Sequence, residues 1–281
     1  MITVGDLSAL REIIREARTA GRTIGFVPTM GALHEGHLSL LRLARRESQF
    51  VVVSIFVNPL QFAPGEDFER YPRRYEQDAK MLEAEAANIL YLPAVGRFYP
   101  NDFSTHVDVN MVSEGGEGAA RPGHFRGVAT VVAKLFLQVA PDVVCLGRKD
   151  LQQVAVIRRM VRDLDFPIRL IVGETVRESD GLALSSRNAY LTVDQRKRAA
   201  LFPKTLFTAQ AQARAGERDP SAIERMTRDA LADAGFSIDY VDVVEPETMK
   251  RPAAIGPTTA LAAAIRLGKT RLIDNVLLLE Q

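Results

Sequence analysis

The chain has 281 residues, enough for one large domain or two ordinary domains with hydrophobic cores. Hydrophobic residues make up 47% of it and charged residues 25%, a composition typical of soluble globular proteins. The 36 basic side chains nearly balance the 35 acidic ones, so the charge predicts neither nucleic acid nor a membrane surface as a partner.

The first 22 residues are predicted to form an amphipathic helix, with apolar side chains at Leu10 and Ile14 and an end near Gly21. This pattern differs from that of a signal peptide, and no apolar run approaches the roughly 20 residues that a membrane span needs. We therefore expect a cytoplasmic protein. The one cysteine, Cys145, lies in an apolar run and is predicted to be a buried, unreactive thiol.

A strand, a glycine-containing turn and a helix are predicted early in the chain. Thr23–Val27 form a short apolar run, Pro28 and Gly31 break it into a turn, and helical spacing begins near His34. His34 and His37 fall on one face of the first helical turn. Unpaired N–H groups and the helix dipole favour an anion there, so the stretch predicts a phosphate site. The alternative is an ordinary strand–helix junction with two exposed histidines.

The glycine-rich fingerprints of dinucleotide sites and of the P-loop are absent from the chain. A lone pair of histidines is weak evidence, so the phosphate prediction depends on the concentration of Pro, Gly and His within ten residues at one helix start. Gly36, between the histidines, is expected to let a ligand approach the backbone closely.

The next strand is predicted over Phe50–Val57, whose continuous apolar run is typical of a central parallel strand covered on both faces. Gln61 follows its C-terminal end, and open α/β sheets bind ligands at that edge. Asn58 and Pro59 are explained equally well by an ordinary turn. A loop at Gly65–Arg74, a helix at Glu76–Ala86 and a strand at Ile89–Leu92 are predicted to follow.

Two glycine-containing segments come next. Gly115–Gly118 is predicted to be a mobile loop, because no strand and helix frame it. Arg121–Gly127 is cationic and precedes a helix predicted over Val128–Val139, so it fits an anion site and a solvated loop equally well.

A second candidate phosphate contact follows the strand predicted over Asp142–Leu146. Gly147 lies at the strand's tip, and Lys149 can place a point charge on a phosphate. A helix that carries Gln153 and a strand over Ile168–Val172 come next. Strands that alternate with helices predict an α/β fold with a doubly wound parallel sheet.

The character of the sequence changes near Val176. Residues 177–188 are small and polar, so we expect a hinge or lid there, with a plain interdomain linker as the alternative. Helices are predicted at Val193–Ala215 and Pro220–Ala234, and strands at Ile238–Val244, Ala260–Leu267 and Thr270–Leu278. Gly268 and Lys269 are expected to form a hairpin turn. The predicted domains are thus 1–175 and 176–281, the second a small α+β domain with an antiparallel sheet.

Five motifs carry a resemblance to a known family. They are PTMGALHEGH at Pro28–His37, FVNPLQF at Phe56–Phe62, RPGHFRGV at Arg121–Val128, KDLQQ at Lys149–Gln153 and DGLALSSRN at Asp180–Asn188. With all five in order, the chain resembles the pantothenate synthetases (pantoate–β-alanine ligases) over essentially its whole length. The first motif alone indicates only the wider HxGH nucleotidyltransferase superfamily.

The resemblance implies a Rossmann-like N-terminal domain, a smaller C-terminal lid domain and a homodimer. It also implies ATP as co-substrate, Mg²⁺, pantoate and β-alanine as ligands. In this family the pantoate carboxylate attacks the α-phosphate of ATP, which releases pyrophosphate and leaves pantoyl adenylate. The amine of β-alanine then displaces AMP to give pantothenate. Such chemistry needs in-line positioning and cationic stabilisation rather than a protein nucleophile.

The resemblance also assigns site residues. His37 is the catalytic histidine, and His34 and Lys149 are expected beside the phosphates. Gln61 and Gln153 resemble the pair that holds pantoate, and Gln61 is also the candidate contact for β-alanine. The residues expected to contact ATP are Met30, Gly31, Ala32, Leu33, His34, Glu35, Gly36, His37, Gly147, Arg148, Lys149, Asp150, Val176, Leu184, Ser185, Ser186 and Arg187.

The chain departs from the family pattern at a few positions. Asp78 aligns with an acidic position near the metal and is the candidate protein ligand of Mg²⁺, but its neighbour here is Gln77. Mg²⁺ often binds mainly to substrate phosphates and waters. Arg148 stands where Glu or Gln is usual and adds a charge beside the phosphate loop. Leu146 and Leu184 replace the common Phe and Met and are conservative.

Two other functions are compatible with the first motif. One is an HxGH transferase that stops at a nucleotidylated product, against which Gln61 and Gln153 argue. The other is a nucleotide sensor without catalysis, against which His34, His37 and Lys149 argue.

Overall fold

The computed structural model describes residues 1–280, which form two compact units. The N-terminal unit comprises Met1–Val109, Gly123–Gly147 and Ile157–Glu174. The C-terminal unit comprises Asn110–Pro122, Arg148–Val156 and the chain from Thr175 onward. The chain therefore enters the C-terminal unit three times, the last time at Thr175.

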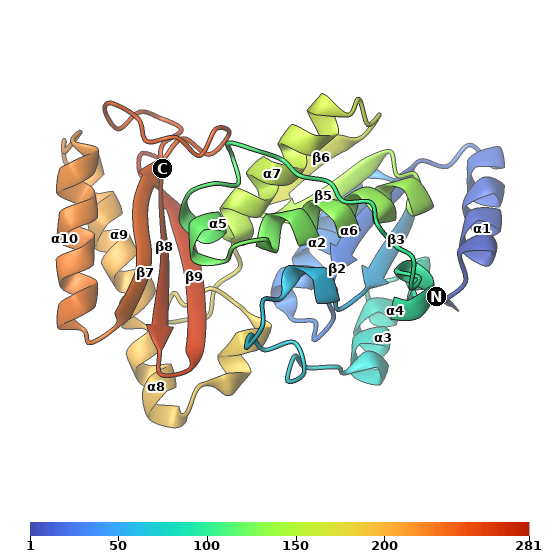
Figure 1. Ribbon diagram of the computed structural model, residues 1–281, viewed down its shortest axis with the longest axis horizontal. Helices are drawn as coiled ribbons and strands as arrows, with labels where there is room; N and C mark the ends of the chain where they lie inside the picture. The colour runs from blue at the N-terminus through green and yellow to red at the C-terminus, as the bar shows by residue number, and fades with distance from the viewer. Residues whose placement is uncertain (281) are drawn as a thin grey trace. The chain divides into compact units, whose positions relative to one another are not determined.

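The N-terminal unit is built on a six-stranded parallel sheet in the order β1-β4-β3-β2-β5-β6 (Figure 1). Its strands are β1 (Ile2–Val4), β2 (Ile24–Thr29), β3 (Phe50–Ile55), β4 (Ile89–Tyr91), β5 (Val143–Gly147) and β6 (Arg169–Gly173). Successive side chains of a strand point to opposite faces, and both faces of β3 are buried, which accounts for its continuous apolar run. The predicted Rossmann-like α/β fold is confirmed.

Helices cover both faces of this sheet. They include α1 (Leu7–Thr19), α2 (Glu35–Glu47), α3 (Tyr75–Ala84), α4 (Val95–Phe98) and α6 (His124–Val139), while α7 (Leu151–Asp163) begins in the C-terminal unit. On one face, Val27 and Val53 share a core with Leu41 of α2. On the other, Phe26 meets Phe136 of α6 edge to face, with ring centroids 6.4 Å apart.

The N-terminal segment differs from the helix predicted over the first 22 residues. Ile2–Val4 form β1, which pairs in parallel with residues 89–91 of β4. The helix α1 starts after Asp6, whose carboxylate accepts N–H bonds from Ser8 and Ala9. A three-residue edge strand carries too little periodicity to detect, and only the pairing with β4 defines it.

The C-terminal unit contains an antiparallel sheet of β7 (Ser237–Val244), β8 (Ala260–Leu267) and β9 (Thr270–Leu277), in that order. Its helices are α5 (Gly116–Ala120), α8 (Val193–Ala199), α9 (Leu201–Arg214) and α10 (Pro220–Asp233). Leu261 and Ala263 of β8 belong to the core that includes α9 and α10. Ala260 and Ala262, on the other face of β8, pack with Leu151. Figure 1 shows α9 and α10 on one side of this sheet and α5 on the other.

The predicted hairpin at Gly268 and Lys269 is confirmed, but one loop prediction and two helix predictions need correction. The segment Gly115–Gly118 is not a loop, because most of it lies in α5. The helix α6 begins at His124, earlier than the predicted start at Val128. The helix predicted from Val193 is divided at Ala200 into α8 and α9. Pro203 accounts for the division, because it has no N–H to donate into the preceding turn.

Cys145 lies in β5 and is fully buried. Burial raises the pKa of its thiol to about 12, so very little of it is in the reactive thiolate form near neutral pH. The predicted burial of the thiol is confirmed, and its raised pKa agrees with the expectation that it is unreactive.

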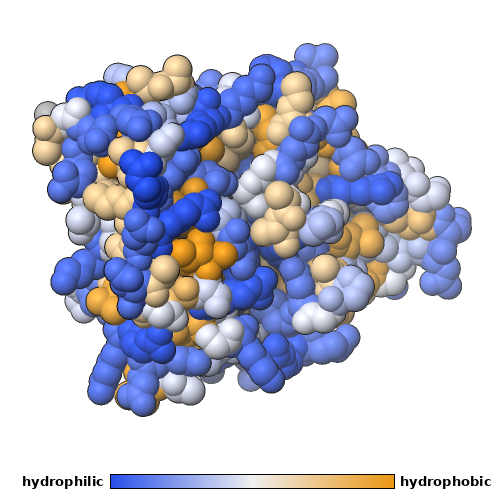
Figure 2. Space-filling view, turned by 60° about the vertical axis from the view of Figure 1, so that its left-hand side comes forward, coloured by the Kyte–Doolittle hydropathy of each residue, from blue (hydrophilic) through white to orange (hydrophobic). Residues whose placement is uncertain are grey.

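The surface is mostly polar on the face drawn in Figure 2, where hydrophobic residues are scattered among hydrophilic ones. Within the described part of the chain, no helix is both long and apolar enough to cross a membrane.

Candidate functional site

The turn after β2 is held in an unusual conformation. Gly31 has φ +82° and Ala32 has φ +50°, both in the left-handed region. A Cβ at Gly31 would lie 2.9 Å from Ile55 Cγ2, so the turn needs glycine there. The carboxylate of Asp78 accepts the N–H groups of Ala32 and Leu33, each at 2.8 Å, and so fixes the path of the chain into α2.

Asp78 is only 1% exposed. Burial raises its pKa, while the two backbone amides and Arg74 oppose the rise. Both carboxylate oxygens are engaged by the turn, and residues 1–280 contain no group of three or more His, Cys, Asp or Glu side chains suited to a metal ion. This donor set does not fit Mg²⁺, which demands near-octahedral oxygen ligands. The geometry makes Asp78 an anchor of the turn.

His34 and His37 form a compact pair at the start of α2. His34 is the residue that precedes the helix, and its backbone N–H donates to Nδ1 of His37 at 3.3 Å. The ring centroids lie 4.1 Å apart. A neutral His37 ring that accepts at Nδ1 carries its proton on Nε2, so Nε2–H is the donor that it can offer to a ligand.

Gly36 leaves room for the His34 ring, a contact that the sequence did not indicate. A Cβ at Gly36 would lie 3.0 Å from both Cε1 and Nδ1 of His34. The group that approaches the Gly36 backbone in this structure is therefore the His34 ring.

Gln61 lies beside this turn, because β2 and β3 are paired so that Thr29 and Ile55 end level. It closes the 3-10 turn η1 (Pro59–Gln61), is buried, and its Nε2 lies 2.9 Å from Met30 Sδ. Asn58 Nδ2 donates to Gln61 Oε1 at 3.1 Å. This bond identifies Oε1 as the acceptor and Nε2 as the donor side of the Gln61 amide, and Nε2 donates to Met30 Sδ.

Two further bonds join the Asn58 side chain to distant parts of the chain. Tyr99 donates its hydroxyl to Asn58 Oδ1 at 2.9 Å, and Asn58 Nδ2 also donates to Gly127 O at 3.1 Å. Sequence reasoning explained Asn58 by an ordinary turn. Its burial beside Gln61 depends on Tyr99 and Gly127, which are distant in the sequence, and no local pattern signals it.

The predicted anion loop at Arg121–Gly127 supports η1 from α6. His124 Nδ1 lies 2.9 Å from the carbonyl oxygen of Gln61. Gly127 packs so closely that a Cβ there would lie 2.1 Å from Leu60 O and 2.7 Å from Gln61 N. These contacts hold the backbone of η1 in place.

Replacing Gly127 with alanine is therefore expected to destabilise the protein and to displace Gln61. Forcing a methyl group into a packed interior costs about 1–3 kcal/mol, and here the obstacle is backbone, which cannot rotate away. Thermal or urea unfolding measures the loss. Gly96→Ala is the control, because nothing lies within 4 Å of its Cβ position and Gly96 is in the short helix α4. Equal stability of the two variants would contradict the expectation.

The C-terminal unit carries the Lys149 turn, η2 (Arg148–Asp150). Lys149 Nζ lies 3.9 Å from Asp150 Oδ1. Arg148, which stands where the family usually has Glu or Gln, forms an ion pair with Glu280 at 2.8 Å. The extra positive charge therefore has an acidic partner near the end of the chain.

The glutamines after the turn differ in their surroundings. Gln152 is buried and holds α5, since it accepts the N–H of Glu117 at 2.8 Å and donates to the carbonyls of Val112 and Gly115 at 3.0 and 2.9 Å. Gln153, the predicted pantoate contact, is partly exposed. The neighbouring amides thus have separate environments, and Gln152 is occupied within the fold.

Residues 176–190 are held both by contacts among themselves and by bonds to Arg196 and β9. Arg177 pairs with Ala183 in an isolated antiparallel bridge, and Ser185 accepts the N–H of Arg187 at the start of η3 (Ser186–Tyr190). Arg196 of α8 holds the preceding loop through Asp180 at 2.6 Å. This bond lowers the pKa of Asp180.

The predicted site residues fall in both units. Met30 to His37, Gln61, Asp78 and Gly147 belong to the N-terminal unit, where the His34–His37 pair, Met30 and Gln61 lie at one edge of the sheet. Lys149, Gln153, Val176 and Leu184 to Arg187 belong to the C-terminal unit, where both η2 and η3 pack against β9.

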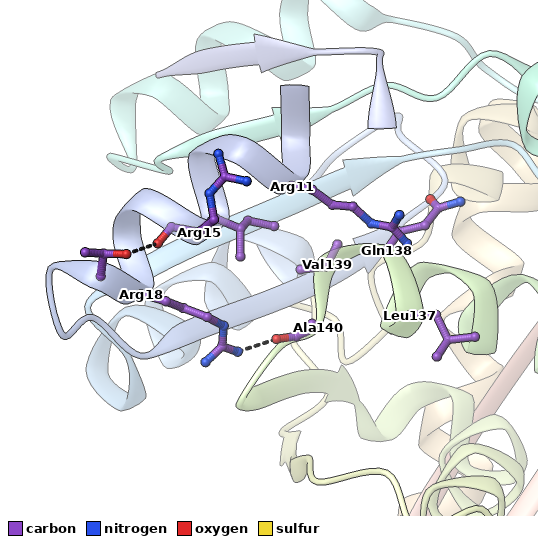
Figure 3. A pocket seen from close by; sticks show the side chains of 9 residues that line it. Arg11, Arg15, Arg18, Leu137, Gln138, Val139 and Ala140 are labelled. Carbon is purple, nitrogen blue, oxygen red and sulfur yellow. Dashed lines mark hydrogen bonds between the residues drawn. The ribbon is translucent and has the colours of Figure 1, made fainter. Parts of the chain in front are cut away.

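A surface cavity of about 460 Å³ lies elsewhere in the N-terminal unit (Figure 3). Arg11 and Arg15 of α1 line it together with residues 137–140 at the end of α6. Arg18, also in its wall, pairs with Asp142 at 3.1 Å. Helices α1 and α6 end shortly before β2 and β5 begin, so this cavity lies near the N-terminal ends of the strands. Gln61 and the histidine pair follow the C-terminal ends of the strands, on the opposite side.

Comparison with known sequences gives a match along nearly the whole chain. The family model described as Pantoate-beta-alanine ligase matches residues 2–277. A pantothenate synthetase of Thermoanaerobacter sp. (strain X514) is 48% identical over 278 residues, which cover 99% of this chain and 98% of the relative. A pantothenate synthetase of Sphingopyxis alaskensis is 50% identical over 277 residues, which cover 98% and 99%.

Solved structures agree with the sequence match. Pantothenate synthetase from Thermus thermophilus superposes with a TM-score of 0.94 at 45% identity, covering 99% of both chains. Pantoate-beta-alanine ligase from Francisella tularensis, complexed with beta-gamma ATP and beta-alanine, superposes with a TM-score of 0.84 at 34% identity. That alignment covers 100% of this chain and 99% of the other.

Proposed function

Because the chain belongs to the pantoate–β-alanine ligase family, we propose that it makes pantothenate by way of pantoyl adenylate. In the first step a carboxylate oxygen of (R)-pantoate attacks the α-phosphorus of ATP, and the bond to the β-phosphate breaks to release pyrophosphate. In the second, the uncharged amine of β-alanine attacks the acyl carbon, AMP leaves, and the amine loses a proton. The products are one amide, one AMP and one pyrophosphate.

The observation that carries the proposal is the His34–His37 pair at the start of α2, next to Met30 and Gln61. Adenylyl transfer builds negative charge on the phosphates, and donors at a helix N-terminus stabilise such charge. His37 Nε2–H is the donor that we assign to this role. His34 supports it through its backbone N–H and through ring contact.

Gln61 and Gln153 are proposed to hold pantoate. The donor side of the Gln61 amide suits a carboxylate or hydroxyl oxygen, because Asn58 already engages the acceptor side. Gln61 is also proposed to contact β-alanine. Burial of its side chain supports the role, because a substrate bound there is shielded from water.

ATP is proposed to bind the turn at Met30–His37, the residues Gly147–Asp150, Val176, and Leu184–Arg187. The Francisella tularensis relative, complexed with beta-gamma ATP and beta-alanine, supports ATP and β-alanine as ligands of this chain. Because Asp78 and the other described carboxylates do not form a metal site, we expect Mg²⁺ to be held by the ATP phosphates and water.

A coupled assay of AMP release tests the function. AMP should form only with ATP and pantoate present, and in the complete mixture AMP, pyrophosphate and pantothenate should appear in equal amounts. A nucleotidylated product that accumulates without an amide would favour another HxGH transferase. No turnover with all three substrates would favour a nucleotide sensor.

We also propose a homodimer, which sedimentation velocity of the full chain tests.

Residues 180–188 are proposed to close over ATP and exclude water, since an acyl adenylate hydrolyses readily. Arg187→Ala is then expected to raise the Michaelis constant for ATP and to increase AMP release without β-alanine, relative to amide formation. Arg187→Lys should restore activity only in part, because lysine lacks the planar fork of arginine. The measurement is the ratio of AMP to pantothenate.

The control for this prediction is Arg225→Ala, which removes an exposed arginine from α10. It should leave the ratio and the ATP dependence unchanged. If Arg187→Ala behaves as Arg225→Ala does, the segment is a linker and not a lid.

A further inference from the structure

Asn275 is a buried polar residue in the second half of β9, with 3% of its surface exposed. Its Nδ2 donates to two consecutive carbonyl oxygens of η2, that of Arg148 at 3.0 Å and that of Lys149 at 2.9 Å. Both protons of the amide are thereby used on one turn. Because two successive carbonyls are held, the backbone direction at Lys149 is set from β9.

The position of Asn275 is itself held by an ion pair. Its N–H donates to Asp274 Oδ1 at 2.8 Å, and its carbonyl accepts from Arg177 Nη2 at 3.2 Å. Arg177 also binds the Asp274 carboxylate through both terminal nitrogens, at 2.6 and 2.9 Å. The Asp274 side chain is 1% exposed and that of Arg177 19%, so the carboxylate of this bidentate pair is shielded from water. The strand therefore holds the Lys149 turn on one side and the start of residues 177–188 on the other.

Stability alone does not explain an asparagine at position 275, because only half of its side-chain amide is hydrogen-bonded. Its Oδ1 is buried and has no hydrogen-bond partner among the described residues. A buried acceptor without a partner costs free energy, so a residue kept only for stability gains little from this amide. What the amide does supply is a paired donor aimed at the two carbonyls that flank the Lys149 Cα.

We propose that Asn275 is a positioning residue for the reaction, which fixes the Lys149 turn so that the ammonium group meets the ATP phosphates. It acts through Lys149 and touches no substrate. The inference rests on the proposed function, in which Lys149 serves adenylate formation. The position of the Lys149 charge then depends on β9, which lies more than a hundred residues later in the chain.

The test compares the two half-reactions in a double-mutant cycle of Asn275→Ala and Lys149→Ala. The first half-reaction is measured as pyrophosphate release from ATP and pantoate, and the second as amide formation from supplied pantoyl adenylate and β-alanine. Alone, Asn275→Ala is expected to slow the first by about 10²-fold, as misplacement of a reacting group does, and to spare the second. In the Lys149→Ala background it should cost no more than about twofold, because no ammonium is left to position.

The outcomes separate failure of this inference from failure of the proposed function. If Lys149→Ala leaves the first half-reaction intact, the role of Lys149 fails, and with it the positioning role. The role of Asn275 alone is overturned if Lys149→Ala slows the first half-reaction but Asn275→Ala does not. It is also overturned if Asn275→Ala slows the first half-reaction by the same factor with and without Lys149, or slows both half-reactions by the same factor.

A matched control isolates the loss of a buried hydrogen bond. Thr227 is fully buried in α10 and donates to Ile223 O at 2.7 Å, so Thr227→Val removes one such bond from the same unit. It should lower the unfolding temperature and leave the ratio of the half-reactions unchanged. Asn275→Ser, which keeps a small polar group in the site, is the second variant if Asn275→Ala does not fold. The same selective loss is expected of it, and an unchanged ratio in that variant overturns the proposal.

Discussion

Replacing His37 with alanine is expected to lower the turnover number by about 10²–10³-fold, the usual cost of losing one donor that stabilises developing charge. The ring stands at the start of α2, and its Nδ1 is engaged by the N–H of His34. Only the Nε2 side is therefore assigned to the phosphates. The measurement is steady-state AMP formation with all three substrates at saturation.

The fold should survive this change, because His37 is only partly buried. His37→Gln should recover part of the activity, since its amide offers an N–H near the position of Nε2. His106→Ala is the control, because His106 is exposed in the same unit. Turnover of His37→Ala close to that of His106→Ala would remove His37 from the mechanism.

Lys149→Ala is expected to depress adenylate formation by a similar factor of about 10²–10³ while sparing the attack of β-alanine on supplied pantoyl adenylate. The charge of Lys149 is proposed to act on the ATP phosphates, which are no longer transferred in the second step. Rapid-quench measurement of each half-reaction separates the two effects. Lys149→Arg should retain part of the first step, because it keeps the charge but not the compact shape of the ammonium group.

Lys204→Ala provides the control for the removal of a positive charge, since Lys204 is exposed on α9. Neither half-reaction should change in that variant. If Lys149→Ala impairs both half-reactions equally, Lys149 has a structural role in the C-terminal unit and not a selective one on ATP.

Local patterns in the sequence predicted much of the fold correctly. The apolar run at Phe50–Val57 identified β3, and helical spacing after His34 identified α2. Cys145 was correctly predicted to be buried from the run around it. Each of these signals comes from neighbouring residues, whose side chains must alternate or repeat when one element packs on a core. The five motifs indicated the family, and the match over residues 2–277 confirms it.

The segment Gly115–Gly118 shows where local patterns fail. It was predicted to be a loop, yet it lies largely in α5, because Glu117 is bound from afar. Gln152 accepts the Glu117 N–H, and Arg271 pairs with its carboxylate at 2.7 Å. A glycine-rich run has no periodicity to read, and the partners that order it lie in distant parts of the chain.

The sequence by itself thus determined most of the elements and the family, and it supplied the candidate site residues as predictions, because motif spacing and hydrophobic period are properties of adjacent residues. Only the tertiary structure decided how those site residues are held. Asp78 fixes the turn at Ala32, Asn58 orients Gln61, and Asn275 holds Lys149. In the first and last of these pairs the partners are joined across long stretches of chain. Hydrogen bonds depend on distance and direction in space, which folding creates and which the order of residues along the chain does not reveal.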